Sequence, residues 1–222
     1  VKAGADPASM LTTMRVLREG SVVGIFPEAS RTYDGRFGKI PQSMGRFIKA
    51  LKVPVTIFNL QGGYGADPRW CRTQRRGRFV GLVKQTLEPE QIAKMSEEQI
   101  VRTLETELHT DETSTRYRYR SRVRAEYLER LLYMCPKCAA ASTLYSKGKY
   151  VMCRACGLRA EYTEQLRFCF ENFDTNIQNV ADWVAWQDTQ LSRYDNAQGV
   201  IFYDEHVALQ TCDRNKLRCN LG

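Results

Sequence analysis

The chain has 222 residues, with 33 Lys and Arg against 25 Asp and Glu, so its formal net charge is +8 and its pI is near 9.1. Hydrophobic residues make up 43% and charged residues 26%, a composition that excludes an intrinsically disordered chain. No apolar run reaches the roughly 20 residues that a membrane-spanning helix requires. The length suits one main core and a smaller second module.

The first half of the chain alternates between helical and strand-like patterns. The expected elements are a helix from Pro7 to Gly20, a strand at Ser21–Phe26, a helix at Ser43–Lys52, strands at Val53–Phe58 and Phe79–Val83, and a helix at Glu97–His109. Strand, loop, helix and strand in succession predict a parallel α/β unit. Ligands bind at the carboxyl ends of parallel strands, so we expect the loop from Glu28 to Arg31 to face a site.

Beyond this half, the sequence becomes polar and basic. Residues 111–122 are typical of a linker, and Val123–Tyr133 is a candidate for a short helix. After residue 157, short alternating runs at Val200–Tyr203 and His206–Gln210 indicate small strands around an aromatic stretch.

Four cysteines have the spacing of a metal site. Cys135 and Cys138 form one CxxC pair, and Cys153 and Cys156 form a second pair after fourteen residues. Each CxxC turn directs two sulfurs at one ion, and a hairpin between the turns brings the pairs together. The pattern predicts a structural Zn²⁺ bound by four thiolates; two disulfides in a secreted chain are the alternative.

These features divide the chain into four expected parts. Residues 1–110 are an α/β domain, 111–132 a basic linker and helix, 133–162 a zinc ribbon, and 163–222 a small β-rich module. The expected fold class is therefore α/β, followed by a zinc ribbon and a short β-rich segment.

Two short segments carry the positive charge. Residues 69–84 contain no acid and six basic residues, which are Arg69, Arg72, Arg75, Arg76, Arg78 and Lys84. Residues 116–130 contain six Arg against Glu126 and Glu129, a net charge of +4. Such local charge predicts contact with anionic lipid, coenzyme phosphates or nucleic acid; a solvated face without a ligand is the alternative.

The loop after the first expected strand joins a carboxylate, a hydroxyl and a guanidinium. Its residues are Phe26, Pro27, Glu28, Ala29, Ser30 and Arg31. Arg can hold a phosphate through two parallel hydrogen bonds, and Glu can hold that Arg or a substrate hydroxyl in place. Taken alone, the same residues also fit an exposed ion pair in a turn.

The stretch from Asp6 to Trp70 resembles the second half of the acyltransferase domain of the 1-acyl-glycerol-3-phosphate acyltransferases of phospholipid synthesis. Phe26 to Arg31 matches the third block of that family, usually Phe-Pro-Glu-Gly-Thr-Arg, with Ala29 in place of Gly and Ser30 in place of Thr. Val53–Phe58 matches the fourth block, a strand containing Val-Pro. The later zinc ribbon is similar to that of a bacterial subgroup.

The resemblance implies a substrate site but no catalytic pair in this chain. Phe26, Pro27, Glu28, Ser30 and Arg31 would hold a lysophosphatidate-like acceptor. The family's catalytic His, which has an Asp five positions later, has no counterpart, because Ser114 and Thr211 stand five residues after His109 and His206. The chain starts at Val1 without an initiator Met, so we expect an upstream segment to carry that pair.

The expected function is acyl transfer from acyl-CoA or acyl-carrier protein to 1-acyl-glycerol 3-phosphate. The expected location is cytoplasmic and peripheral, at the inner face of the cell membrane, with the basic patch at 69–84 against anionic lipid. A zinc-ribbon module that binds nucleic acid through its arginines and interleaved Tyr117, Tyr119 and Trp70 is the alternative.

Overall fold

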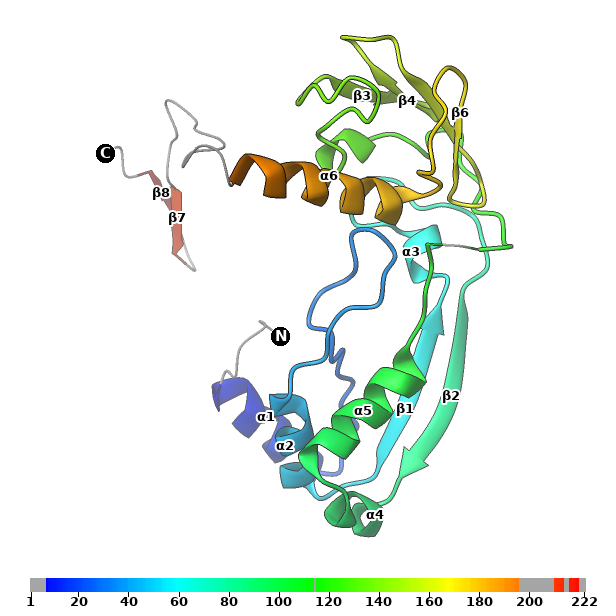
Figure 1. Cartoon of the computed structure of the whole chain (residues 1–222). Helices are drawn as coiled ribbons and strands as arrows, with labels where there is room; N and C mark the ends of the chain where they lie inside the picture. The colour runs from blue at the N-terminus through cyan, green and yellow to red at the C-terminus, as the bar shows by residue number, and fades with distance from the viewer. Residues whose placement is uncertain (1–6, 114, 196–209, 214–215, 220–222) are drawn as a thin grey trace. The chain divides into compact units, whose positions relative to one another are not determined.

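The computed structural model describes residues 7–113, 115–195, 210–213 and 216–219 (Figure 1). Two compact units are distinguished, residues 1–185 and 186–222, and each is described by itself. The boundaries expected after residues 110, 132 and 162 all fall inside the first unit.

The first unit begins with a layer of helices and two strands. Its elements are α1 (Pro7–Arg18), α2 (Ser43–Leu51), β1 (Val55–Gln61), α3 (Gly63–Ala66), β2 (Val80–Leu87), α4 (Pro89–Lys94) and α5 (Glu97–Leu108). The expected helices at α1, α2 and α5 are confirmed, as are the strands at β1 and β2 within a few residues. A capping box starts α5, since Ser96 Oγ accepts the Gln99 N–H at 3.1 Å and Gln99 Oε1 accepts the Ser96 N–H at 2.7 Å.

The expected strand at Ser21–Phe26 is wrong. This segment has no regular secondary structure, and the side chain of Val22 is 98% exposed. A strand needs a neighbour for its backbone hydrogen bonds, and no described strand pairs with this one. A β-branched apolar sequence supplies the propensity for a strand but not the partner.

The parallel unit expected from the strands at Ser21–Phe26 and Val53–Phe58 is also wrong, because its first strand is absent, and the second, β1, pairs instead with β2 in the antiparallel direction. Their register runs from Val55 opposite Leu87 to Gln61 opposite Val80, with an irregularity between Ile57 and Phe58. The connection between them holds α3 and the basic residues 69–78. The Glu28–Arg31 loop therefore does not follow a parallel strand, and other contacts must position it.

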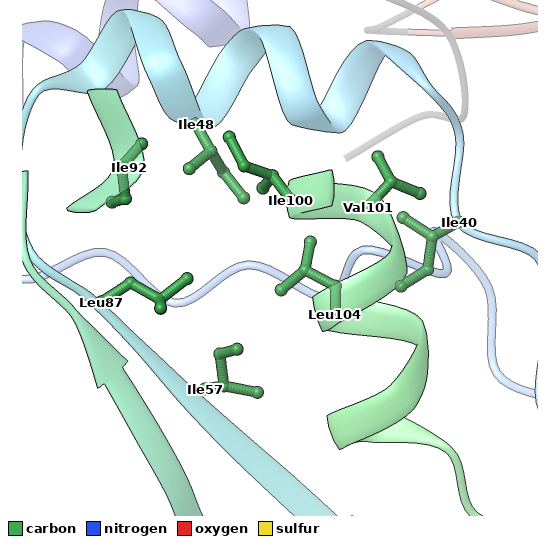
Figure 2. Packing of buried hydrophobic residues seen from close by; sticks show 8 residues of the cluster. All are labelled: Ile40, Ile48, Ile57, Leu87, Ile92, Ile100, Val101 and Leu104. Atoms are coloured by element: carbon green, nitrogen blue, oxygen red, sulfur yellow. The ribbon is translucent and has the colours of Figure 1, made fainter. Parts of the chain in front are cut away.

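Helix α5 lies along β1, α2 packs against α5, and α4 contacts α2 at the end of the strand pair (Figure 1). Figure 2 shows the buried side chains between them, which are Ile40, Ile48, Ile57, Leu87, Ile92, Ile100, Val101 and Leu104. Ile100, Val101 and Leu104 on α5 thus belong to the core, and Leu108, one turn after Leu104, packs against it while partly buried.

The segment expected to be a linker is packed into the first unit. The carboxylate of Glu112 accepts the N–H groups of Gly62 at 2.6 Å and Tyr64 at 2.7 Å. Tyr119 is 3% exposed, and its hydroxyl donates to the carbonyl of Arg78 at 3.0 Å. These long-range bonds order residues that a polar composition alone marks as a linker.

The helix expected at Val123–Tyr133 is replaced by turns and a short 3₁₀ helix, η1 (Leu128–Arg130). The backbone of Tyr127 has φ 73°, in the left-handed region, which ends any continuous α-helix. Its N–H donates to Ser146 Oγ at 2.8 Å, a residue from the following sheet. Tertiary hydrogen bonds therefore override the local helical pattern here.

A four-stranded antiparallel sheet follows the first cysteine pair. Its strands are β3 (Leu144–Lys147), β4 (Tyr150–Cys153), β5 (Arg159–Tyr162) and β6 (Phe168–Phe170), paired in chain order. A turn at Lys147 and Gly148 joins β3 to β4. The segment expected to be a zinc ribbon, residues 133–162, contains β3, β4 and β5, and β6 extends the sheet beyond it.

Helix α6 (Val180–Asp195) was not expected and crosses the boundary between the two units. Asn179 starts it, since its side-chain oxygen accepts the N–H of Asp182 at 2.9 Å. The second unit also contains the antiparallel pair β7 (Gln210–Asp213) and β8 (Lys216–Cys219). The run at Val200–Tyr203 lies outside the described residues, as does the run at 206–210 except for Gln210.

Among the described helices, none has both the length and the apolar character required to cross a bilayer.

Candidate metal centre and the neighbouring loop

The four cysteines of the two CxxC pairs meet in one cluster. All four sulfur atoms lie within 4.8 Å of one another, with Cys135 and Cys156 3.6 Å apart and Cys138 and Cys153 3.8 Å apart. Four sulfurs around a tetrahedral zinc ion at about 2.3 Å lie about 3.8 Å from each other. The cluster can therefore bind a structural metal ion such as zinc, as the spacing predicts.

The alternative of two disulfides is not what the structure shows, because all four cysteines are free thiols. The backbone prepares both turns in the same way. The first thiol of each pair, Cys135 or Cys153, accepts N–H groups from the two residues at the end of its own CxxC turn. The residues that follow, Ala139 and Gly157, have φ 56° and 69° and so turn the chain away from the metal.

The environment of the thiols differs from one to the next. Burial raises the pKa of Cys135 and of Cys156 above the ordinary value. Burial also opposes ionisation at Cys153, but hydrogen bonds from the Thr143 hydroxyl and from backbone N–H groups outweigh it and lower its pKa to about 6. Thr143 Oγ1 lies 3.2 Å from Cys153 Sγ and is the nearest outer partner of the cluster.

The donor set fits a closed site. Four thiolates complete the tetrahedral shell of zinc and leave no position for a substrate. The metal would therefore link the turn before β3 to the turn after β4 and stabilise the ribbon, rather than take part in a reaction.

The substrate-binding residues expected in the loop lie close together but on the surface. Phe26 is 76% exposed, and the turn that begins there is closed by the Ala29 N–H, which donates to the carbonyl of Phe26 at 3.1 Å. Pro27 is partly buried, and Ser30 is exposed. Ala29 has φ 60°, so the position where the acyltransferase block usually has Gly adopts a left-handed conformation here.

Glu28 is fixed by the chain ten residues later. Its carboxylate accepts the N–H of Gly38 at 2.6 Å, and a Cβ at Gly38 would lie 2.8 Å from the same oxygen. Partial burial raises the pKa of Glu28, and the hydrogen bond from Gly38 opposes that shift. Glu28 thus orders the loop and does not contact Arg31 in the described structure.

Arg31 and Ser30 are held by the turn after α3. Arg31 Nη1 donates to the carboxylate of Asp67 at 2.8 Å and to its carbonyl at 3.4 Å. Arg69 Nη1 donates to Ser30 Oγ. Neither Asp67 nor Arg69 can be inferred as a partner of the loop from the sequence, because 36 and 39 residues separate them from it.

The basic patch at 69–84 is not continuous, because Arg75 is only 5% exposed. Its guanidinium lies 4.8 Å from the ring centre of Trp70 and 5.3 Å from that of Tyr162, and Nη2 donates to the carbonyl of Arg124 at 2.6 Å. The other two donor nitrogens have no hydrogen-bond partner. Arg75 therefore links the segment after α3 to the four-stranded sheet, and it does not belong to the basic surface.

Arg124 is also mostly buried and is paired with Glu161, but four exposed arginines from the two basic segments stack in pairs over two tyrosine rings. Arg72 and Arg130 lie 4.9 and 4.6 Å from the ring centre of Tyr127. Arg78 and Arg116 lie 4.8 and 5.3 Å from that of Tyr117. The backbones of Arg76 and Arg120 also pair through two hydrogen bonds of 3.0 and 2.7 Å. The segments that appear separate in sequence thus form one basic surface.

Of the two histidines of the chain, His109 lies within the described residues. His109 ends α5 and packs against Phe37, with ring centres 5.6 Å apart. Residues 114 and 206, which the comparison with the acyltransferase pair involves, lie outside the described residues.

Comparisons of the chain with protein-family models, with curated proteins and with solved structures find no match.

Proposed function

We propose that this chain is part of an acyltransferase of phospholipid synthesis and binds the phosphate of a 1-acyl-glycerol 3-phosphate acceptor. The observation that carries the proposal is the accessible guanidinium of Arg31, whose side chain is 64% exposed at the end of a fixed loop. The acyl donor would be acyl-CoA or acyl-carrier protein. The resemblance of Phe26–Arg31 to the acyltransferase block supplies the reaction class.

The contacts of the loop support a role in binding anions. Asp67 engages only Nη1 of Arg31, through its carboxylate and its carbonyl, and leaves the three N–H donors on Nε and Nη2 for other partners. The carboxylate holds the side chain without occupying the outer edge that would meet a phosphate. Arg69 adds a second positive charge next to Ser30.

In this proposal the acceptor hydroxyl attacks the thioester carbonyl, and its proton passes to a His base that the described residues do not supply. The C–S bond then breaks and the thiol leaves. We accordingly expect the 222-residue chain alone to bind acceptor but to show no acyl transfer. Turnover of radiolabelled acyl-CoA with lysophosphatidate by the purified chain would contradict this assignment of the base.

The basic surface supports a peripheral position at the cytoplasmic face of the membrane. Arginines near anionic lipid contribute about 1 kcal/mol each, and the stacked arginines over Tyr117 and Tyr127 remain exposed. Because Arg75 is buried, the variant that tests this surface is Arg76→Gln with Arg78→Gln. We expect it to sediment less with anionic vesicles than the wild-type chain.

The binding proposal is tested by titrating the zinc-loaded chain with sn-glycerol 3-phosphate in a calorimeter. Arg31→Lys should weaken binding about tenfold, because Lys cannot form two parallel hydrogen bonds to a phosphate. Arg46→Lys is the matched control, since Arg46 is an exposed arginine outside the loop. Like Arg31 it forms an ion pair, with Glu97, at an N–O distance of 3.4 Å. Equal affinity in both variants and the wild type would remove the loop from the acceptor site.

The alternative, a nucleic-acid-binding module, is favoured by one observation. The arginines alternate with tyrosines on the joined basic surface, and such surfaces can stack exposed bases. The rings are already covered by guanidinium groups, which favours a phosphate-binding role over base stacking. Tight binding of single-stranded oligonucleotides, lost in Tyr117→Ala but unaffected in Arg31→Lys, would reverse this preference.

A further inference from the structure

A cavity of about 510 Å³ opens beside the loop, at a junction between the first layer and the segment that leads into the cysteine ribbon. It is lined by Tyr33, Arg69, Trp70, Arg130 and Leu131. Two of these five residues are arginines and none is a carboxylate. The cavity therefore combines positive charge with an aromatic wall.

The charge of these two arginines is not neutralised within the described residues. Neither Arg69 nor Arg130 forms an ion pair there, and the nearby acids have other partners, with Asp67 on Arg31 and Glu129 on Ser146. Each guanidinium instead lies over a tyrosine ring, Arg69 over Tyr33 at 4.2 Å and Arg130 over Tyr127 at 4.6 Å. A stacked guanidinium keeps its N–H donors in its own plane, where an anion can accept them.

Arg69 connects this cavity to the loop that holds Arg31, because it donates to Ser30 Oγ. A phosphate bound by Arg69 and Arg130 would give charge-assisted hydrogen bonds to two positive side chains that form no ion pair within the described residues. Arg31 alone is already paired with Asp67. Arg69 and Arg130 thus supply positive charge that is not neutralised by a carboxylate within the described residues, unlike that of Arg31.

Arg130 is placed by the ribbon and not by its own helix, which is only three residues long. The N–H of Tyr127 donates to Ser146 Oγ at 2.8 Å, and the same hydroxyl bonds to the carboxylate of Glu129. Ser146 lies on β3, whose first residue, Leu144, is paired with Cys153 of β4. Strand pairing and the bonds of Ser146 therefore connect the cysteine cluster to Tyr127 and Glu129, which precede Arg130 in the chain.

We propose that Arg69 and Arg130 form a binding site for a phosphomonoester, and that the metal-loaded ribbon positions Arg130 in it. The site takes the phosphate of the acceptor, so this inference rests on the proposed function and extends it to a residue supplied from the ribbon side. The metal has no contact with substrate in this arrangement, and it acts on affinity through β3 and Ser146.

The site is tested by calorimetric titration of the full zinc-loaded chain with sn-glycerol 3-phosphate. Arg69→Gln and Arg130→Gln should each weaken binding about tenfold. Arg154→Gln is the control, because this substitution removes the same charge outside the cavity. Arg154 is an exposed arginine of the ribbon and is stacked on Tyr145, 5.1 Å from the centre of its ring. Wild-type affinity in both cavity variants, or an equal loss in the control, would overturn the site.

Two further ligands distinguish the source of the phosphate. Inorganic phosphate and adenosine 3′,5′-bisphosphate, which carries phosphates like those of coenzyme A, are titrated in the same way. Weaker binding of glycerol 3-phosphate than of the bisphosphate, with both dependent on Arg130, would assign the cavity to the donor and contradict its assignment to the acceptor. Loss of affinity in Arg31→Lys alone would leave the proposed function standing and overturn this inference.

The link to the metal is tested without removing it. Ser146→Ala deletes the hydroxyl that holds Tyr127 and Glu129 while leaving all four cysteines in place. We expect this variant to retain its zinc and to bind glycerol 3-phosphate severalfold more weakly, with no added loss when combined with Arg130→Gln. Unchanged affinity in Ser146→Ala, or fully additive losses, would show that the ribbon does not position Arg130.

Discussion

The cysteine ribbon and the Phe26–Arg31 loop both bring a few polar side chains together. They differ in how far along the chain the hydrogen-bond partners of those side chains lie. In the ribbon, each CxxC turn supplies the N–H groups that surround its own first thiol. In the loop, Glu28, Ser30 and Arg31 have partners 10 to 39 residues away, and two of those partners are exposed side chains. One bound metal ion could hold the first arrangement together, whereas the second depends on several separate weak contacts.

This contrast predicts that one substitution at a metal ligand unfolds the whole ribbon, whereas one substitution in the loop changes stability only slightly. A structural zinc ion contributes about 10–16 kcal/mol to the folding of small zinc peptides, whereas an exposed ion pair such as Arg31 with Asp67 contributes about 0–1 kcal/mol. The following variants are ordered from the largest expected effect to the smallest.

The largest effect is expected from removing one metal ligand. Cys153→Ser should lower bound zinc from one equivalent to less than about half and abolish cooperative unfolding of the ribbon, since the shell is then incomplete. Metal analysis and thermal unfolding followed by circular dichroism measure both quantities. Cys169→Ser is the control, because Cys169 is an exposed thiol outside the cluster. Full zinc content in Cys153→Ser would mean that the cluster is not the metal site.

A smaller effect is expected where the first layer meets the ribbon. Arg75→Ala removes two ring contacts and the bond to the Arg124 carbonyl, and should lower the free energy of unfolding by about 2–3 kcal/mol. Arg75→Met keeps the apolar bulk and removes two unpaired donors, so it should cost less than about 1 kcal/mol. Urea denaturation compares the two variants. A loss in Arg75→Met as large as that in Arg75→Ala would show that the charge and its hydrogen bond, and not the apolar bulk, stabilise this position.

The loop and the ribbon each contain an alanine in the left-handed region, and these form a matched pair. Ala29→Gly in the loop and Ala139→Gly after the first CxxC turn should each stabilise the chain by up to about 1 kcal/mol, because Gly adopts φ near 60° without steric cost. Urea midpoints measure both. Destabilisation by Ala29→Gly together with stabilisation by Ala139→Gly would show that the backbone is strained at residue 139 of the ribbon and not at residue 29 of the loop.

The smallest effect concerns the ionisation of Glu28. Burial raises its pKa, so the folded state binds this proton more tightly than the unfolded state does. The stabilisation from protonation is complete below the ordinary pKa of glutamate and is lost as the pH rises through the raised value. Relative to Glu28→Gln, the wild-type chain should therefore become more stable as the pH falls towards 4. Parallel stability curves for the two proteins would contradict a raised pKa.

The same difference in distance explains what could be predicted from the sequence. The clustering of the four cysteines is predicted correctly, because the two CxxC pairs are local patterns. Helices α1, α2 and α5 were likewise predicted from periodicity and caps. Strand pairing is not local, so the strand at 21–26 and the parallel arrangement were wrong.

The candidate site shows the same limit. The charge run at 69–84 contains no signal that separates buried Arg75 from exposed Arg76, since burial depends on Trp70 and on Tyr162 from the distant β5. The contribution of Arg130 to the cavity was missed because a helix was expected there. Asp67 and Arg69 were missed as partners because the loop reaches them only through the fold.

The packing of Tyr119 constrains the order in which related sequences can diverge. A Cβ placed on Gly65 or Gly77 would lie 2.3 or 2.1 Å from its ring, so neither glycine can acquire a side chain while the tyrosine stays in place. Tyr119 must therefore be replaced by a smaller residue before either glycine is replaced. Among homologous sequences, a larger residue at position 65 or 77 should occur only together with a smaller residue at position 119.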